Sequence, residues 1–322
     1  MALLAGCGAA QPPIGAPGAI PQGPAIAAHA RGGASGVLPG TKSGDLLYVS
    51  SGNTVYVLSY PAKNLLLTIS LPNDQYDASG WLCSDANGNV FVPAHNEGNP
   101  GSVVYEYAHG ETNLKRTLTI SSFTTRGCGS DPKTGDLAVA GYTGSDGKPT
   151  GAVAVFKKAQ GSPTIYNDPA FQLLFYCGYD LGGNLFVDGP SYQYIAELPY
   201  GGSGLNNITF LRRHSRGQVQ WDGTYMTMLT QHGRMGRLHT TVYRFGVAGS
   251  IATIIGKTAL SLRGLAANES WLVGSKIVMA PFTYGGHSLF IWKYPDGGKA
   301  VRTTFPTLGR FDGLTISVAP SQ

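Results

Sequence analysis

Short apolar runs separated by turn residues recur along the chain from about residue 44. The runs are rich in Val, Tyr, Thr and Leu, and Gly, Pro, Asn or Asp bounds them. This pattern predicts β-strands joined by tight turns. No window carries a long amphipathic period of 3.6 residues, so we expect few helices. No uncharged apolar run approaches about 18 residues, so the sequence predicts no membrane-spanning helix.

The runs group into a repeated unit, marked by an aromatic-rich strand that ends in a turn. The turns begin at Tyr60, Tyr107, Lys158, Leu198, Phe245 and Tyr294, with separations of 47, 51, 40, 47 and 49 residues. A period in the forties with about four strands per unit is typical of propeller blades. The sequence therefore predicts an all-β fold, a six-bladed β-propeller of four-stranded blades over residues 41–322.

A hairpin motif precedes the aromatic strand in each unit. Three units read CSDANGNVFVP, CGSDPKTGDLAVA and CGYDLGGNLFVD, whereas the fifth reads VQWDGTYMTML and the sixth is degenerate. Asp bonds its own backbone in such turns, and Gly or Asn accepts a positive φ. Asp85, Asn87 and Asn89 have a spacing like that of a calcium loop, but Val90 and Asn96 stand where Gly and Glu are needed. We interpret them as turn residues.

The two ends of the repeat array complement each other. The first unit lacks the innermost strand that opens the others, and residues 313–319 form such a strand with no unit after it. We expect this C-terminal strand to complete blade 1 and close the ring, which removes exposed sheet edges.

The motif D-x-x-G-N-[VL]-[YF]-V, followed by the aromatic strand, resembles the propellers of the NHL-repeat, SMP-30/gluconolactonase and streptogramin-lyase group. The resemblance covers about 280 residues and implies six blades. Lactonases of this group hold a divalent metal with inner-strand Glu and Asn or Asp, whereas the inner strands here offer Gln218 and Gln220 and no Glu that the sequence places. The lyases pair a His base with Glu-bound magnesium, for which the loop residues His95, Glu97, His287 and His232 are candidates. The alternative function is therefore that of a metal-dependent lyase or lactonase-type hydrolase, with a divalent metal in the central channel. The favoured function needs no cofactor.

The N-terminus carries a different signal. Leu4-Ala5-Gly6-Cys7 resembles the bacterial lipobox, in which the Cys becomes lipidated, although residues 1–7 lack a basic region and a full apolar stretch. Residues 8–40 are rich in Pro, Gly and Ala and predict a flexible tether. We expect an extracytoplasmic protein of the bacterial cell envelope, lipid-anchored at Cys7 or secreted. The alternative is an ordinary apolar terminus with a chance Cys.

The remaining cysteines, Cys83, Cys128 and Cys177, lie in similar repeat contexts. Their odd number excludes a complete disulfide framework. One bridge is an option, but three buried thiols are favoured because free Cys packs as a small hydrophobe. A zinc site is disfavoured because there is no CxxC spacing.

Charge is unevenly distributed. Residues 1–204 carry 10 Lys and Arg against 14 Asp and Glu, whereas residues 205–322 carry 13 against 4. Arginines recur in the loops before inner strands, and further basic residues lie near them. The candidate site residues are Arg126, Arg216, Arg263 and Arg310, joined by Arg213, His232 and Arg234. Such a ring can bind carboxylate, phosphate or sulfate. The alternative is that each arginine bonds loop carbonyls or the carboxylate of a neighbouring blade.

The predicted function is a binding or interaction module for an unknown ligand, an anionic glycan or a protein, with membrane contact through the lipid anchor only. No nucleic-acid partner is expected, because there is no nucleic-acid motif and no run of more than two adjacent Lys or Arg. A structural surface protein is the second alternative.

Overall fold

Strands dominate the computed structural model, which describes residues 43–73, 75–78, 81–96, 101–144, 149–189, 194–210, 217–233, 238–262, 269–281 and 286–320. The one helix in these ranges is a 3-10 turn, η1 (Lys157–Ala159). Across the same residues, no helix has the length and apolar character needed to cross a membrane. The predicted anchor at Cys7 and the tether at residues 8–40 lie outside the described residues.

The first three strand groups are antiparallel meanders. One sheet has the order β25-β1-β2-β3, another the order β12-β11-β10-β9, and a third is built on β4-β6-β7-β8 with β5 beside β6. Their strands are β1 (Leu46–Ser51), β2 (Thr54–Ser59), β3 (Leu65–Ser70), β4 (Asp77–Ala78), β5 (Cys83–Ser84), β6 (Val90–His95), β7 (Gly101–Tyr107), β8 (Leu114–Ser121), β9 (Phe123–Ser130), β10 (Leu137–Thr143), β11 (Thr150–Phe156), β12 (Thr164–Asp168) and β25 (Gly313–Ser317).

The other strands belong to one sheet of twelve among the described residues. They are β13 (Tyr176–Tyr179), β14 (Leu185–Asp188), β15 (Tyr194–Leu198), β16 (Asn206–Phe210), β17 (Val219–Trp221), β18 (Met226–His232), β19 (His239–Ala248), β20 (Ile251–Ser261), β21 (Ser270–Val273), β22 (Lys276–Met279), β23 (Ser288–Lys293) and β24 (Gly297–Thr304). The sequence predicts separate four-stranded blades, but here β20 pairs in parallel with both β16 and β24. The reason is length, since the β19–β20 hairpin is long enough for β20 to meet both neighbouring edges.

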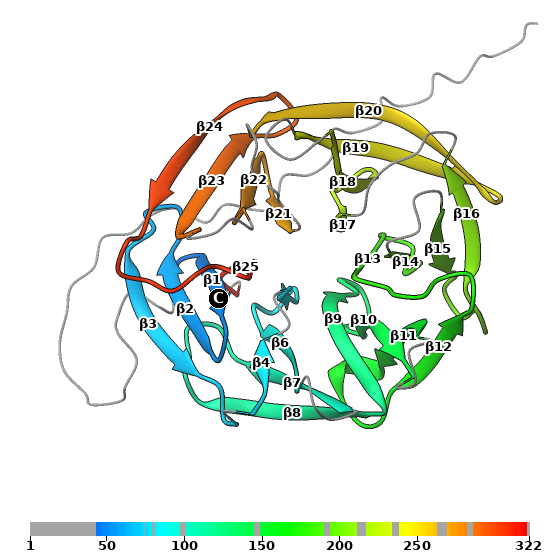
Figure 1. The fold of residues 1–322 in the computed structure, drawn as a ribbon, viewed down its shortest axis with the longest axis horizontal. Helices are drawn as coiled ribbons and strands as arrows, with labels where there is room; N and C mark the ends of the chain where they lie inside the picture. Colours follow the sequence, from blue (N-terminus) through cyan, green and yellow to red (C-terminus); the bar gives the residue numbers. More distant parts are fainter. Residues whose placement is uncertain are drawn as a thin grey trace, which may run out of the picture.

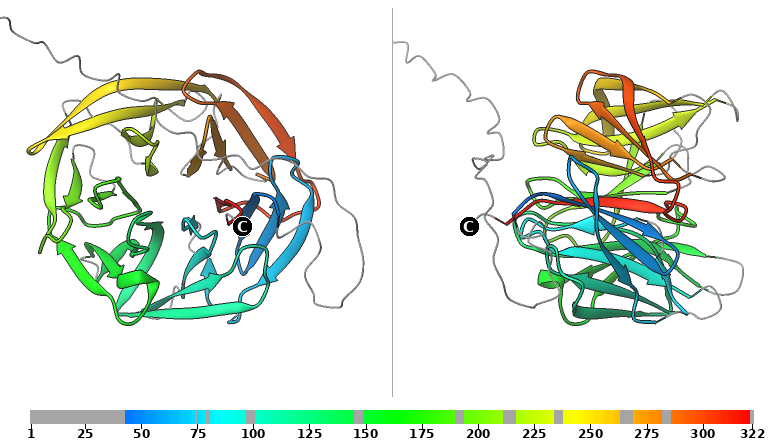
Figure 2. Two further views of the ribbon diagram at one scale, coloured as in Figure 1. Left: turned by 180° about the vertical axis from the view of Figure 1, so that it is seen from behind. Right: turned by 90° about the vertical axis from the view of Figure 1, so that its left-hand side faces the viewer.

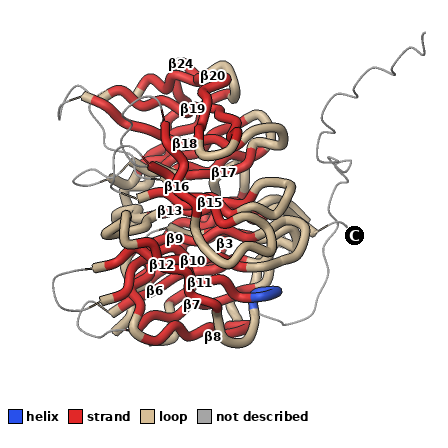
Figure 3. The backbone as a smooth tube through the Cα atoms, turned by 90° about the vertical axis from the view of Figure 1, so that its right-hand side faces the viewer, coloured by secondary structure: helices blue, strands red, loops and turns tan. Residues whose placement is uncertain are grey.

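The strand groups lie around a common centre (Figure 1), with β9, β13, β17, β21 and β25 innermost and β3, β8, β12, β16, β20 and β24 at the rim. The C-terminal β25 pairs antiparallel with β1, from Leu46 opposite Ser317 to Ser50 opposite Gly313. Figure 2 shows this red strand beside the blue β1 in side view. Figure 3 shows the loops gathered at the two ends of the strands, with η1 at one end.

The core lies between neighbouring groups, because both faces of each meander are buried. In β1, Leu46 and Tyr48 pack toward β6 and β7, whereas Leu47 and Val49 pack toward β22 and β23. All four side chains are fully buried. At about 1.5–3 kcal/mol for each buried large apolar side chain, this packing is the main stabilising contribution.

The inner strands approach one another so closely that glycine is required. A Cβ on Gly129 of β9 would lie 2.8 Å from the carbonyl oxygen of Cys177 on β13. The same proximity brings Cys83 and Cys128 together, with Cα atoms 5.5 Å apart, in a disulfide between β5 and β9. The expectation of three buried thiols is therefore wrong, and Cys177 alone of these three is a buried free thiol. The physical reason is that equivalent inner-strand positions of consecutive units lie side by side.

Candidate functional site

The basic residues predicted as a ring are described only in part. Arg126, Arg310 and His232 belong to the described residues, whereas Arg213, Arg216, Arg234 and Arg263 lie outside them. The ring as a whole therefore stays a prediction.

Arg126 lies in a β-bulge of β9. Thr125 pairs with Gly141 and Gly127 pairs with Ala140, which leaves Arg126 as the extra residue between them. A bulge changes the direction of a side chain relative to the regular ladder. The Arg126 guanidinium lies 5.7 Å from the ring centroids of both Tyr142 and Phe175.

An aromatic cluster continues from this stack. Trp81 meets Phe175 edge to face at 5.3 Å and lies 4.8 Å from Tyr176. Arg126, Trp81 and Tyr142 are partly exposed, whereas Phe175 and Tyr176 are buried. A cation over aromatic faces at this distance is attracted by the ring quadrupoles. The cluster therefore fixes one guanidinium near the start of an inner strand.

Arg310 and His232 have different surroundings. Arg310 donates from Nε and Nη2 to Oδ1 of Asp312, at 3.0 and 2.8 Å, and Oδ2 of Asp312 accepts from the Gly52 amide at 3.0 Å. Arg310 is thus bonded to a carboxylate two residues away in its own loop, and not to the neighbouring blade's carboxylate that the alternative expects. The His232 ring stacks on His239 at 5.3 Å.

Sequence reasoning missed Glu269, which lies just before the inner strand β21. Its side chain is buried, and Oε2 accepts a hydrogen bond of 2.6 Å from the Leu314 amide of β25. Burial raises the pKa of this carboxyl well above its usual value, and the Leu314 and Leu82 amides offset only part of the effect. No Glu of an inner strand could be placed from the sequence, and Glu269 lies one residue before such a strand. The repeat motif is degenerate around Glu269, so the sequence does not show which position this residue takes relative to the inner strand.

The candidates for metal chemistry do not converge within the described residues. No group of three or more His, Cys, Asp or Glu side chains there has the geometry to hold a metal ion. His95 is buried in β6, and Nδ1 of His287 donates to the Gly309 carbonyl at 3.1 Å. Glu97, the proposed neighbour of His95, lies outside the described residues.

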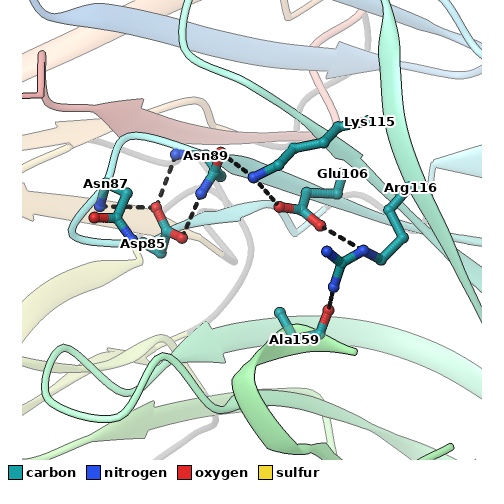
Figure 4. A network of polar contacts seen from close by, with 7 residues as sticks. All are labelled: Asp85, Asn87, Asn89, Glu106, Lys115, Arg116 and Ala159. Atoms are coloured by element: carbon teal, nitrogen blue, oxygen red, sulfur yellow. Dashed lines mark hydrogen bonds and ion pairs between the residues drawn. The ribbon is translucent and has the colours of Figure 1, made fainter. Parts of the chain in front are cut away.

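The turn between β5 and β6 is organised by Asp85 (Figure 4). Its carboxylate accepts hydrogen bonds from the Asn87 amide at 2.9 Å, the Asn89 amide at 2.8 Å and the Asn89 side chain at 2.7 Å. The carboxylate is thus directed at its own turn, as the turn interpretation predicts.

A buried carboxylate, Glu106 of β7, lies next to this turn and is neutralised by two cations (Figure 4). Lys115 Nζ lies 2.7 Å from one Glu106 oxygen and donates to Asn89 Oδ1 at 2.9 Å. Arg116 Nε lies 3.5 Å from the other Glu106 oxygen, and its Nη1 donates to the Ala159 carbonyl of η1 at 2.5 Å. We call Asp85, Asn89, Glu106, Lys115 and Arg116 the clamped corner.

The β13–β16 group has a second corner in the same register, without the cations. Phe91 pairs with Glu106 and Phe186 pairs with Glu197, so the two glutamates are equivalent. Glu106 pairs with Arg116, whereas Glu197 pairs with Asn206. Leu205 likewise stands where Lys115 precedes Arg116. We call Asp180, Asn184, Glu197, Leu205 and Asn206 the open corner.

A cavity of about 420 Å³ lies between the open corner and the neighbouring β17–β19 strands. Carboxylates and aromatic rings both line it, and the residues that matter here are Asp180, Glu197, Phe186, Trp221, Tyr225 and Phe245. Burial, and to a smaller degree the charge of Asp180, raises the pKa of Glu197. Of the predicted basic residues that the structure describes, none is among the lining residues.

Comparison with known proteins supports the fold and nothing narrower. No family model matches the chain, and no curated protein matches it. A protein of unknown function from Bacteroides caccae aligns with a TM-score of 0.62 at 9% identity, over 85% of this chain and 99% of that one. A chain of the Nidogen/Laminin complex aligns with a TM-score of 0.59 at 11% identity, over 86% and 100%. The β-propeller domain of Cps50 (Swd1) from Myceliophteria thermophila aligns with a TM-score of 0.52 at 12% identity, over 86% and 88%. The fold is a β-propeller.

Proposed function

We propose that this propeller is an extracytoplasmic binding module for an anionic ligand. In this proposal the six repeat units form six blades that resemble NHL repeats. The strand β25 closes the ring by pairing with β1. In support, β25 pairs with β1 over five residues, and the Asp-centred turn recurs at Asp85, Asp131 and Asp180.

The Cys83–Cys128 disulfide supports the proposed compartment. It joins β5 to the inner strand β9 across a sequence separation of 45 residues. Disulfides persist in the periplasm and outside the cell, and they are rare in a reducing cytosol. A lipid anchor at Cys7 is the proposed route of attachment to the envelope.

The proposal of an anionic ligand rests on the position of Arg126, which is stacked on aromatic rings. Arg126 lies at a bulge of the inner strand β9, and its guanidinium lies 5.7 Å from the ring centroids of Tyr142 and Phe175. A guanidinium offers five N–H donors in a planar fork that matches carboxylate, phosphate or sulfate. An arginine fixed in this way loses less conformational entropy when it binds an anion than a free side chain does.

Calorimetric titration with a sulfated or uronic-acid glycan tests the proposal. We expect binding to the natural protein, a loss of about tenfold or more in Arg126→Gln, and partial retention in Arg126→Lys, which keeps the charge and loses the fork. Arg302→Gln is the matched control, because Arg302 also stacks on an aromatic ring, Phe290 at 5.6 Å, but lies on the rim strand β24. Equal affinities of the natural protein and Arg126→Gln would contradict the proposal. Absence of glycan binding to the natural protein would favour a structural surface protein instead.

The metal-dependent lyase or lactonase alternative needs a convergent donor set near the channel. The described residues supply no such set.

A further inference from the structure

The open corner carries a second site, distinct from the Arg126 stack and independent of the proposal made for it. We propose that the cavity between the open corner and β17–β19 binds the primary ammonium group of an aliphatic amine, with Glu197 as its counter-ion. The ligand class is an alkylamine, either free or as a lysine side chain on a peptide.

The clamped corner shows how this protein holds such a group. The Lys115 ammonium lies 2.7 Å from Glu106 and donates to Asn89 at 2.9 Å. The open corner repeats the glutamate as Glu197 and the asparagine as Asn184, and it repeats the Asp-centred turn, since Asp180 accepts from the Asn184 amide and side chain, each at 2.9 Å. Asn184 Oδ1 already accepts from the Tyr200 amide at 3.0 Å, so Glu197 is the acceptor that the open corner leaves to an ammonium group, and Leu205 stands in the place of Lys115.

Glu197 is left without the neutralisation that Glu106 receives. Its carboxylate has no hydrogen bond and no ion pair among the described residues, and Leu205 and Asn206 occupy the positions of the two cations. No lysine, arginine or histidine is among the described residues that line the cavity. A partly buried carboxylate in this setting gains from a cation that reaches it from solution, because the local dielectric is below that of water.

The rest of the lining suits an ammonium group on an apolar chain. Trp221 and Tyr225, which are partly exposed, contribute aromatic surface from the β17–β19 side, whereas the ring of Phe245 in the same lining is buried. Aromatic faces attract ammonium ions, and they also cover the methylene groups that carry them. Trp221 Nε1 and Tyr225 Oη have no hydrogen-bond partner among the described residues, so both remain available to a ligand.

A neutral sugar is the competing ligand, since an aromatic platform with polar groups also suits carbohydrate. Two features favour the amine. Glu197 and Asp180 give the cavity a negative potential, which a neutral ligand does not use. The equivalent corner of the same molecule is also filled by an ammonium group and not by a hydroxyl.

Calorimetry on the full chain at neutral pH tests the site with 1,5-diaminopentane, its neutral analogue 1,5-pentanediol, and Nα-acetyl-lysine methylamide. We expect both amines, or one of them, to bind, and the diol to bind at least about tenfold more weakly because it forms no ion pair. The relative affinity of the two amines distinguishes a free amine from a lysine side chain as the source.

Two variants test the site from opposite directions. Glu197→Gln removes the counter-ion, and Asn206→Arg places a cation where Arg116 stands in the clamped corner. Each should weaken amine binding by about tenfold or more. Glu111→Gln, a glutamate in the turn after β7 and outside the cavity lining, is the control and should leave binding unchanged.

Unchanged affinity in Glu197→Gln, equal binding of the amine and the diol, or no amine binding to the natural protein would each overturn the proposal. Thermal unfolding of both variants shows whether a loss of binding reflects a loss of fold. Because Asn206 is exposed, Asn206→Arg should keep the fold even if Glu197→Gln does not.

Discussion

The clamped corner and the open corner share one backbone arrangement, but they differ in the residues that surround the glutamate. In both, an Asp organises the turn between two strands, an Asn follows it, and a Glu occupies the same register position of the third strand. In the clamped corner the fourth strand supplies Lys115 and Arg116, and Glu106 is only 3% exposed. In the open corner the fourth strand supplies neutral residues, and a cavity remains beside Glu197.

This difference distinguishes a glutamate that stabilises the fold from a glutamate that is available to a ligand, at equivalent positions of one fold. A carboxylate with two cations is a closed network that ties the turn to η1, whose Ala159 carbonyl accepts from Arg116. A carboxylate in the same position without cations is a recognition element. The β9–β12 group shows a third solution, because Val155 stands at this position opposite Ala138, and the ion pair of this corner joins Lys157 to Asp136 at 2.7 Å instead.

Removal of the cations from the clamped corner should have the largest effect. The double variant Lys115→Met/Arg116→Met leaves Glu106 buried and unpaired, so we expect a loss of about 3–5 kcal/mol in the free energy of unfolding. Urea unfolding measures it. Restoring neutrality with Glu106→Met in the same background should recover much of the loss, and a double variant as stable as the natural protein would contradict the role of the ion pairs.

The shared turns should respond alike in the two corners. Asp85→Ala and Asp180→Ala each remove a carboxylate that accepts from an amide and from a side-chain amide of the following Asn. We expect each to cost about 1–3 kcal/mol in the free energy of unfolding. Urea unfolding of the two variants side by side measures the costs. A large cost at Asp85 and none at Asp180 would mean that the turn depends on the clamp and not on its own hydrogen bonds.

The sequence predicts the strands, the Asp-centred turns and the C-terminal strand beside the first, because these follow from local periodicity and turn chemistry. It does not predict the Cys83–Cys128 bridge, which depends on the side-by-side placement of consecutive inner strands. It also misses the buried Glu269 and the cavity beside Glu197. Glu197 and Glu106 look alike along the chain, and their difference lies in residues of the next strand, which only the pairing register identifies.

The smallest expected effect concerns the ionisation of Glu197 itself. Its pKa is raised above the usual value of 4.5, chiefly by burial and then by Asp180. A carboxyl whose pKa is raised on folding binds its proton more tightly in the folded state, so the stability that it contributes is present below pH 4.5 and is lost as the pH rises through the folded value. Glu197→Gln, a neutral isostere, should therefore melt slightly above the natural protein at pH 7, and the difference should shrink or reverse at pH 4. Scanning calorimetry at the two pH values measures both. The same difference at both pH values would mean that the carboxylate of the open corner carries no electrostatic cost, and the contrast with the clamped corner would then rest on packing alone.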